Sequence, residues 1–283
     1  MQMLLTDTTV NERRLDAAGV STKVLEAGSG PSVVLLHGQG GFAEMWMPIL
    51  AGLAPTYHVV APDLPGLGAS EAPAGSFSPG AVVEWLARLI DKTCDSPPAL
   101  VGTSLGGTIA ARFAAVHSDR LTNLVLVDAG GLSGPVRPAL PVLLALIRHS
   151  LRPSRGTALG MLRRVAFDEA AVRRQMGRRF DPFIDYLVDR SRIPSVQRAN
   201  RQLLRQIGFP RIPPEQLSRI SVPTTLIWGR HDRVMPLRTA EIASARYGWP
   251  LHVIEDAGHF LSAEQPGVFL KVLTESLALT RRG

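Results

Sequence analysis

The chain has 283 residues, of which 45% are hydrophobic and 19% charged, a balance that excludes a disordered protein. Its single cysteine, Cys94, excludes an intrachain disulfide and argues against a metal site built from cysteines. The net charge is +7, no run of about 18 apolar residues exists, and the N-terminus lacks a basic start followed by an apolar stretch. We therefore expect no transmembrane helix, no secretory signal and a cytoplasmic location.

Four short apolar runs in the first half of the chain are typical of buried strands. They lie at Val33–Leu36, Val59–Ala61, Ala99–Gly102 and Leu124–Val127. None alternates polar with apolar residues, as a half-exposed strand would. Helical patterns at 79–93 and 106–117 lie between the later runs. This repetition of strand, helix and strand predicts a parallel sheet with right-handed crossovers.

The pattern changes after the fourth run. Helical periodicity continues from 133 to 220 without a convincing strand, and proline-rich seams at 134–138 and 210–214 border this segment. Strands return at Thr224–Trp228 and Leu251–Ile254, and a last helix is predicted from about 264 to 279. We expect one core, formed by residues 1–132 and 221–283, that is interrupted by a helical insert at 133–220.

The insert also carries most of the positive charge. It contains 17 arginines, no lysine and six acidic residues, a balance of +11. A solvated outer face is the simplest interpretation, and a peripheral docking surface for anionic lipid, an acidic partner or a charged substrate is the alternative. We expect no nucleic-acid partner, because few aromatic residues accompany the arginines and no nucleic-acid-binding motif is present.

A nucleophile is predicted at Ser104, in a segment that follows a strand and begins a helix. Gly102 and Gly106 flank the serine at two residues on each side, as a strained strand-to-helix turn requires. Such a turn exposes the hydroxyl and places the Leu105 N–H at a helix N-terminus, where it can stabilise an oxyanion. The alternative is an ordinary turn that contains glycine.

A serine hydroxyl needs a base, and the base needs an acid. His259 follows a predicted strand, at the sheet edge where open α/β sheets bind ligands. Asp232, after the strand at 224–228, is the first candidate for the acid, and Asp128, after the strand that precedes the insert, is the second.

The glycine-rich loop at 37–41 supplies the second oxyanion donor, with the Gln39 N–H as first choice and Gly40 as the alternative. Three apolar residues near these motifs are candidates for lining an acyl pocket, with core packing as the alternative: Phe42, Met235 and Phe260. No metal site, P-loop or dinucleotide motif is visible, so we expect no metal and no cofactor.

These motifs together resemble the α/β-hydrolase fold. The resemblance rests on the order Ser104, Asp232, His259, on the His37-Gly38 loop, on the segment 63–70 and on Gly258-His259-Phe260. It covers about residues 20–132 and 221–280. It implies a mostly parallel eight-stranded sheet flanked by helices, with the insert as a helical cap after strand six.

The resemblance extends to serine esterases, carbon–carbon bond hydrolases and cofactor-free perhydrolases. We therefore expect a serine hydrolase that cleaves a carboxylic ester of a small or medium apolar substrate through an acyl-enzyme. The alternatives are a carbon–carbon hydrolase of the meta-cleavage product type or a perhydrolase with the same triad, and a non-catalytic receptor on the same fold. Relatives that cleave carbon–carbon bonds often have tryptophan after the catalytic histidine, where this chain has Phe260.

Overall fold

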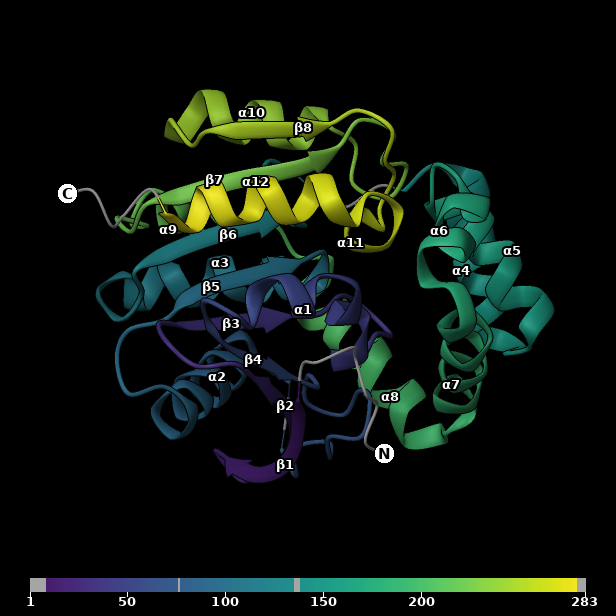
Figure 1. Cartoon of the computed structure of the whole chain (residues 1–283), viewed down its shortest axis with the longest axis horizontal. Coiled ribbons are helices and arrows are strands. Elements are labelled where there is room, and N and C mark those ends of the chain that lie inside the picture. The colour runs from purple at the N-terminus through teal and green to yellow at the C-terminus, as the bar shows by residue number, and fades with distance from the viewer. Residues whose placement is uncertain (1–8, 76, 135–137, 279–283) are drawn as a thin grey trace.

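A computed structural model describes residues 9–75, 77–134 and 138–278, and one eight-stranded sheet lies at its centre (Figure 1). The spatial order is β1-β2-β4-β3-β5-β6-β7-β8, and only the pairs β1–β2 and β2–β4 are antiparallel. The predicted fold class is thereby confirmed. The strands are β1 (Val10–Ala17), β2 (Val20–Ala27), β3 (Ser32–Leu36), β4 (His58–Pro62), β5 (Ala99–Thr103), β6 (Asn123–Val127), β7 (Thr224–Gly229) and β8 (Leu251–Ile254).

Burial explains why the predicted strands in the middle of the sheet were visible in the sequence. Every residue of β3, β6 and β7 is buried, because helices cover both faces of the sheet. Of the two strands that escaped prediction, β1 is the edge strand and β2 lies between β1 and β4. β1 has the sequence VNERRLDA and is largely exposed, so its charged residues hide any apolar pattern while they protect the edge from pairing with another chain.

Helices form a layer on each face of the sheet (Figure 1). The helices α1 and α12 pack together and cover the face turned toward the viewer, whereas α2 and α3 cover the other face. The predicted last helix corresponds to α12, which begins at Pro266 just after the short helix α11. The elements outside the 133–220 segment are η1 (Ala43–Trp46), α1 (Met47–Leu53), α2 (Pro79–Thr93), α3 (Leu105–His117), η2 (Ser118–Arg120), α10 (Arg238–Tyr247), α11 (Leu261–Glu264) and α12 (Pro266–Ala278).

Helices α4 to α8 lie beyond the carboxyl ends of the parallel strands, at the right of Figure 1, whereas the short α9 that follows them packs against α3 at the left. We call this segment, from α4 to α9, the cap. It comprises α4 (Leu140–Leu151), α5 (Arg155–Val165), α6 (Glu169–Met176), η3 (Gly177–Arg179), α7 (Phe180–Arg192), α8 (Pro194–Leu203), η4 (Leu204–Gly208) and α9 (Pro214–Leu217).

The cap agrees with the helical periodicity of the predicted insert, although residues 135–137 at its first proline seam lie outside the described residues. The boundaries at 132 and 221 stay a prediction. In the described part of the chain, no helix is both long and apolar enough to cross a membrane.

Candidate active site

Ser104 lies at the tip of a strained turn between β5 and α3. Its φ is 52° and its ψ is −117°, a conformation that costs energy for any residue with a side chain. The two flanking glycines make the turn possible. A Cβ at Gly102 would lie 2.4 Å from the Gly106 carbonyl oxygen, and one at Gly106 would lie 2.3 Å from the Leu36 carbonyl oxygen. The turn therefore holds the serine hydroxyl above the sheet edge, at the wall of a cavity.

His259 is oriented by Asp232. The distance from His259 Nδ1 to Asp232 Oδ2 is 2.7 Å, and the other carboxylate oxygen accepts the N–H groups of Val234 (2.7 Å) and Met235 (2.9 Å). Since a carboxylate can only accept, Nδ1 carries the proton and Nε2 is left as the basic nitrogen. The structure thus pairs His259 with the first candidate for the acid.

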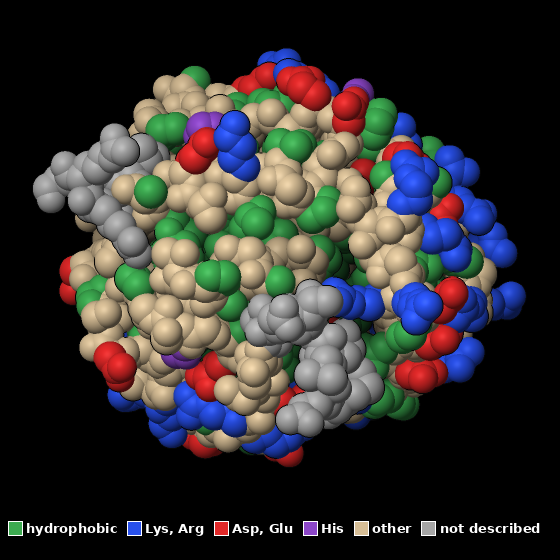
Figure 2. Space-filling view, viewed as in Figure 1, with side chains coloured by type: hydrophobic (Ala, Val, Ile, Leu, Met, Phe, Trp, Pro, Cys, Tyr) green, Lys and Arg blue, Asp and Glu red, His purple; other side chains and the backbone are tan. Residues whose placement is uncertain are grey.

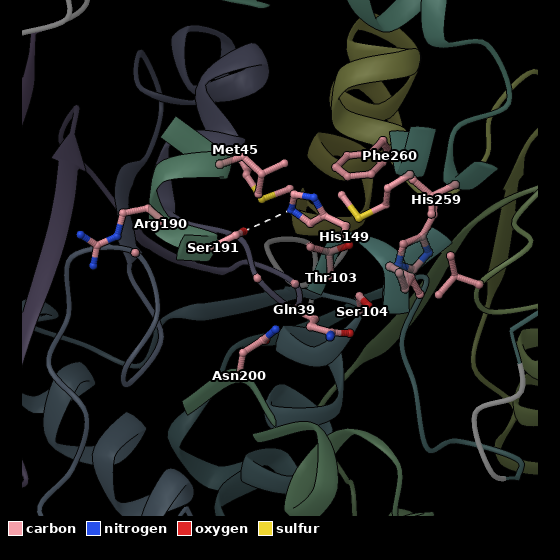
Figure 3. Close-up of a pocket in the computed structure, with 18 of the residues that line it drawn as sticks. Gln39, Met45, Thr103, Ser104, His149, Arg190, Ser191, Asn200, His259 and Phe260 are labelled. Atoms are coloured by element: carbon pink, nitrogen blue, oxygen red, sulfur yellow. Dashed lines mark hydrogen bonds between the residues drawn. The ribbon is translucent and has the colours of Figure 1, made fainter. Parts of the chain in front are cut away.

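Ser104 and His259 line the same cavity (Figure 3). Within the described residues no hydrogen bond joins them. In unliganded enzymes this bond is often long and tightens only when substrate binds. The arrangement is therefore a serine and an oriented imidazole at the wall of one cavity.

Asp128, the second candidate for the acid, lies directly behind this pair. It is fully buried and accepts the Gly229 N–H at 3.0 Å. One ligand atom from each of Asp128, Asp232 and His259 lies within 4.8 Å of the other two. Burial, followed by the neighbouring charge of Asp232, raises the pKa of the Asp128 carboxyl well above its ordinary value. The raised pKa favours the protonated form of Asp128, which can donate a hydrogen bond to the neighbouring Asp232 carboxylate.

The loop at 37–41 is held by a neutral histidine. His37 is fully buried, its Nδ1 contacts the Gly38 carbonyl at 2.8 Å, and its Nε2 accepts the Leu64 N–H at 3.0 Å. Burial lowers the pKa of His37 to about 4. The loop packs on Ser104, because a Cβ at Gly38 would lie 3.2 Å from the Ser104 Cβ. Gln39, the next residue, lines the cavity beside the serine.

Sequence reasoning missed Glu264. This buried carboxylate accepts four backbone N–H groups: Gly258 (3.0 Å), Phe260 (3.0 Å), Phe167 (2.6 Å) and Asp168 (3.3 Å). Two belong to the loop at 255–260 that carries the histidine, which we call the histidine loop, and two belong to the cap. The pKa of Glu264 is raised by burial, which these four hydrogen bonds oppose. No sequence motif indicates that Glu264 joins the histidine loop to the cap, because its partners are backbone groups far apart in the chain.

Two cavities meet at Ser104. The first, of about 160 Å³, has an apolar wall that includes Met45, Met161 and Phe260. Its polar lining includes Arg190, Asn200, His149 and Ser191, with a His149–Ser191 hydrogen bond of 3.2 Å (Figure 3).

The second cavity, of about 170 Å³, is lined by Ser104, Gln39, Leu105 and Met235, together with residues of α4 and η4. Phe260 and Met235 thus face cavity space. The third residue proposed for the acyl pocket, Phe42, lines neither cavity, because its buried ring packs against Phe183 and Tyr186 at centroid distances of 5.2 and 4.6 Å.

A family model described as the alpha/beta hydrolase family matches residues 33–272, from the third strand to the last helix. The chain belongs to this family. The serine turn, the histidine loop and the glycine-rich loop all fall within the matched region, so the resemblance seen in the sequence is confirmed.

The relatives of this hydrolase include lipases and meta-cleavage product hydrolases. Monoacylglycerol lipase abhd6-B of Xenopus laevis is 28% identical over 89% of this chain and 76% of its own. The crystal structure of a membrane phospholipase A, a bacterial virulence factor, has a TM-score of 0.81 at 28% identity, over 97% of this chain and 87% of that one. The 2-hydroxy-6-oxo-6-phenylhexa-2,4-dienoate hydrolase of Rhodococcus sp. strain RHA1 has a TM-score of 0.84 at 25% identity, over 95% and 99%.

Proposed function

We propose that the protein is a serine hydrolase that cleaves a carboxylic ester with an apolar acyl group, using Ser104, His259 and Asp232. The observation that carries this proposal is the strained serine at a cavity wall that it shares with a histidine whose Nδ1 is fixed by a carboxylate. A hydroxyl beside a free imidazole nitrogen is activated for attack on a carbonyl.

The reaction proceeds in two halves. His259 Nε2 takes the Ser104 proton as the oxygen attacks the carbonyl carbon, and the backbone N–H groups of Leu105 and Gln39 stabilise the oxyanion. His259 then gives this proton to the leaving alcohol, and an acyl-serine remains. A water molecule attacks the acyl group after losing its proton to His259, and the acid leaves as the serine recovers its hydrogen.

The test is turnover of p-nitrophenyl esters of increasing acyl length by the wild-type protein and by Ser104→Ala. We expect the variant to lose at least about 1,000-fold in kcat, since removal of a nucleophile leaves only binding and the oxyanion donors. Val116→Ser is the matched control, because Val116 is exposed on α3 and has no proposed part in the site. Full activity in Ser104→Ala would show that another group does the chemistry.

A second candidate is hydrolysis of a carbon–carbon bond in a substrate that carries a carboxylate. One observation favours it: Arg190 lines the first cavity, and its Nε has no hydrogen-bond partner among the described residues. A guanidinium is suited to pair with a carboxylate. A perhydrolase reaction would use the same triad, but no contact in the cavity distinguishes it from ester hydrolysis.

Arg190→Gln separates the two candidates. For a carboxylate substrate we expect the variant to raise KM for a vinylogous diketone acid by about 10-fold or more, because a charge-assisted hydrogen bond is lost. Neutral esters should be hydrolysed with unchanged KM. A higher kcat/KM for neutral esters than for the diketone acid in the wild-type protein would favour the esterase.

A further inference from the structure

Helix α4 of the cap carries an apolar stripe that faces away from the protein. Successive residues of a helix are turned by about 100°, so residues 140, 144, 147 and 151 fall on one side. These residues are exposed to 66% (Leu140), 57% (Leu144), 45% (Ile147) and 76% (Leu151). The opposite side of the helix, which includes Val142 and His149, is buried. The stripe is therefore a second hydrophobic face, and none of the described residues covers it.

Arginines without partners border this stripe. Arg148 and Arg152 follow Ile147 and Leu151 directly in α4 and its C-terminus, and Arg201 and Arg205 lie on α8 and η4, which adjoin the second cavity. All four are exposed, and in the described part of the chain none forms an ion pair or a side-chain hydrogen bond.

The acidic residues of the cap lie elsewhere. Five of its six acids pair with other arginines along α5, α6 and α7: Asp168, Glu169, Asp181, Asp185 and Asp189. The sixth, Glu215, belongs to α9. Figure 2 shows basic side chains gathered over the cap at the right of the view, with acidic ones among them. The border of the α4 stripe therefore keeps an uncompensated positive charge.

The second cavity connects this face to the nucleophile. Its lining includes Leu143 and Ile147 of α4, Phe209 after η4, and Arg201, and at its inner end Gln39, Leu105 and Ser104. Phe209 is also half exposed and extends the apolar surface beyond α4. An acyl chain that enters between α4 and η4 would reach Ser104 along an apolar path.

We propose that the outer face of α4, with its arginine border, docks the cap onto an anionic membrane surface and that the second cavity admits the acyl chain of a membrane-resident ester. The docking part stands on the surface alone, and the delivery part rests on the proposed ester hydrolysis. An apolar helix face bordered by arginine is the pattern that inserts at the headgroup boundary of anionic lipid. Neither a purely apolar protein partner nor a second copy of this chain would explain why unpaired arginines border the apolar stripe.

The test uses full-length protein in a Ser104→Ala background, so that binding is measured without turnover. Binding is followed by sedimentation with vesicles of phosphatidylcholine alone or mixed with phosphatidylglycerol. We expect binding to the anionic vesicles only, and we expect it to weaken between about 0.1 M and about 1 M salt, as the screening length falls from ~10 Å to ~3 Å.

Two sets of variants locate the surface. The triple variant Leu140→Ser, Leu144→Ser, Leu151→Ser, which leaves the lining of both cavities unchanged, should lower the partition coefficient by about 10-fold or more, because it removes the inserted side chains. The control replaces three apolar residues exposed elsewhere, Val116, Ile242 and Val268, with serine, and it should bind as the parent does. The double variant Arg148→Gln, Arg152→Gln should lower the partition coefficient for anionic vesicles by about 10-fold or more.

Three results would overturn the docking proposal: no sedimentation with anionic vesicles at low salt, equal loss in the control triple variant, or a stripe variant that changes only the oligomeric state in lipid-free buffer. Activity then separates the two proposals. If the triple variant with Ser104 restored hydrolyses soluble esters normally but vesicle esters poorly, docking and delivery are both supported. If the wild-type protein binds vesicles yet hydrolyses no ester, the docking stands and the proposed function is wrong.

Discussion

Replacing the buried carboxyl behind the triad by its amide should make the protein more stable at neutral pH. In Asp128→Asn, the amide oxygen can still accept the Gly229 N–H, and the amide NH₂ can donate to the Asp232 carboxylate as the protonated acid does. The amide has nearly the shape of the acid but never ionises. The substitution therefore keeps the hydrogen bonds. It removes only the dependence of the free energy of unfolding on the protonation of this side chain.

The sign and size of the effect follow from the raised pKa. Above the ordinary aspartate pKa of about 3.9, the unfolded chain releases the Asp128 proton while the folded protein keeps it. The free energy of unfolding of the wild-type protein therefore falls, from this group alone, by about 1.4 kcal/mol for each pH unit until the pH reaches the pKa of the folded carboxyl. The variant lacks this pH dependence. Its free energy of unfolding relative to that of the wild type therefore rises by about 1.4 kcal/mol for each pH unit.

Urea unfolding at intervals between pH 4 and pH 7 measures this difference. We expect the wild type and Asp128→Asn to be about equally stable near pH 4 and to diverge steadily above it. Asp189→Asn, at a carboxylate whose side chain is 72% exposed, is the matched control and should track the wild type. A difference between wild type and Asp128→Asn that stays constant across this range would refute the argument that the folded protein holds the extra proton.

Three further predictions concern the supports of the site. The pKa of His37 is lowered from 6.5 to about 4, so the unfolded chain binds a proton at this residue at a higher pH than the folded protein does. The free energy of unfolding should therefore fall by about 3 kcal/mol as the pH decreases from 6.5 to about 4. His37→Gln, which keeps an acceptor for the Leu64 N–H, should remove that loss in acid unfolding curves.

Gly102→Ala places a Cβ 2.4 Å from a carbonyl oxygen and should cost about 1–3 kcal/mol in chemical denaturation. Gly80→Ala, where a Cβ meets nothing within 4 Å, should not destabilise. Glu264→Gln should lower kcat about 10-fold with little change in KM, because an amide cannot accept all four N–H groups that fix the histidine loop. A KM change of equal size would indicate that Glu264 shapes the pocket instead.

The sequence by itself determined the features that depend on local chemistry. Strands buried on both faces must be apolar throughout, so β3, β5, β6 and β7 could be read directly from their residues. The turn at Ser104 tolerates no side chain at Gly102 or Gly106, which leaves a recognisable spacing around the nucleophile. The chain order of the serine, the acid and the histidine then predicted the family.

Only the tertiary structure decided which distant groups meet. Asp128 and Asp232 each follow a strand, and both were reasonable acids until the neighbouring positions of β6 and β7 placed the two carboxyls together, with His259 hydrogen-bonded to Asp232. Glu264 was invisible because its partners are backbone N–H groups, which every residue type offers. The exposed stripe of α4 also required the fold, since an apolar periodicity shows that a helix has a hydrophobic face but not whether anything covers it.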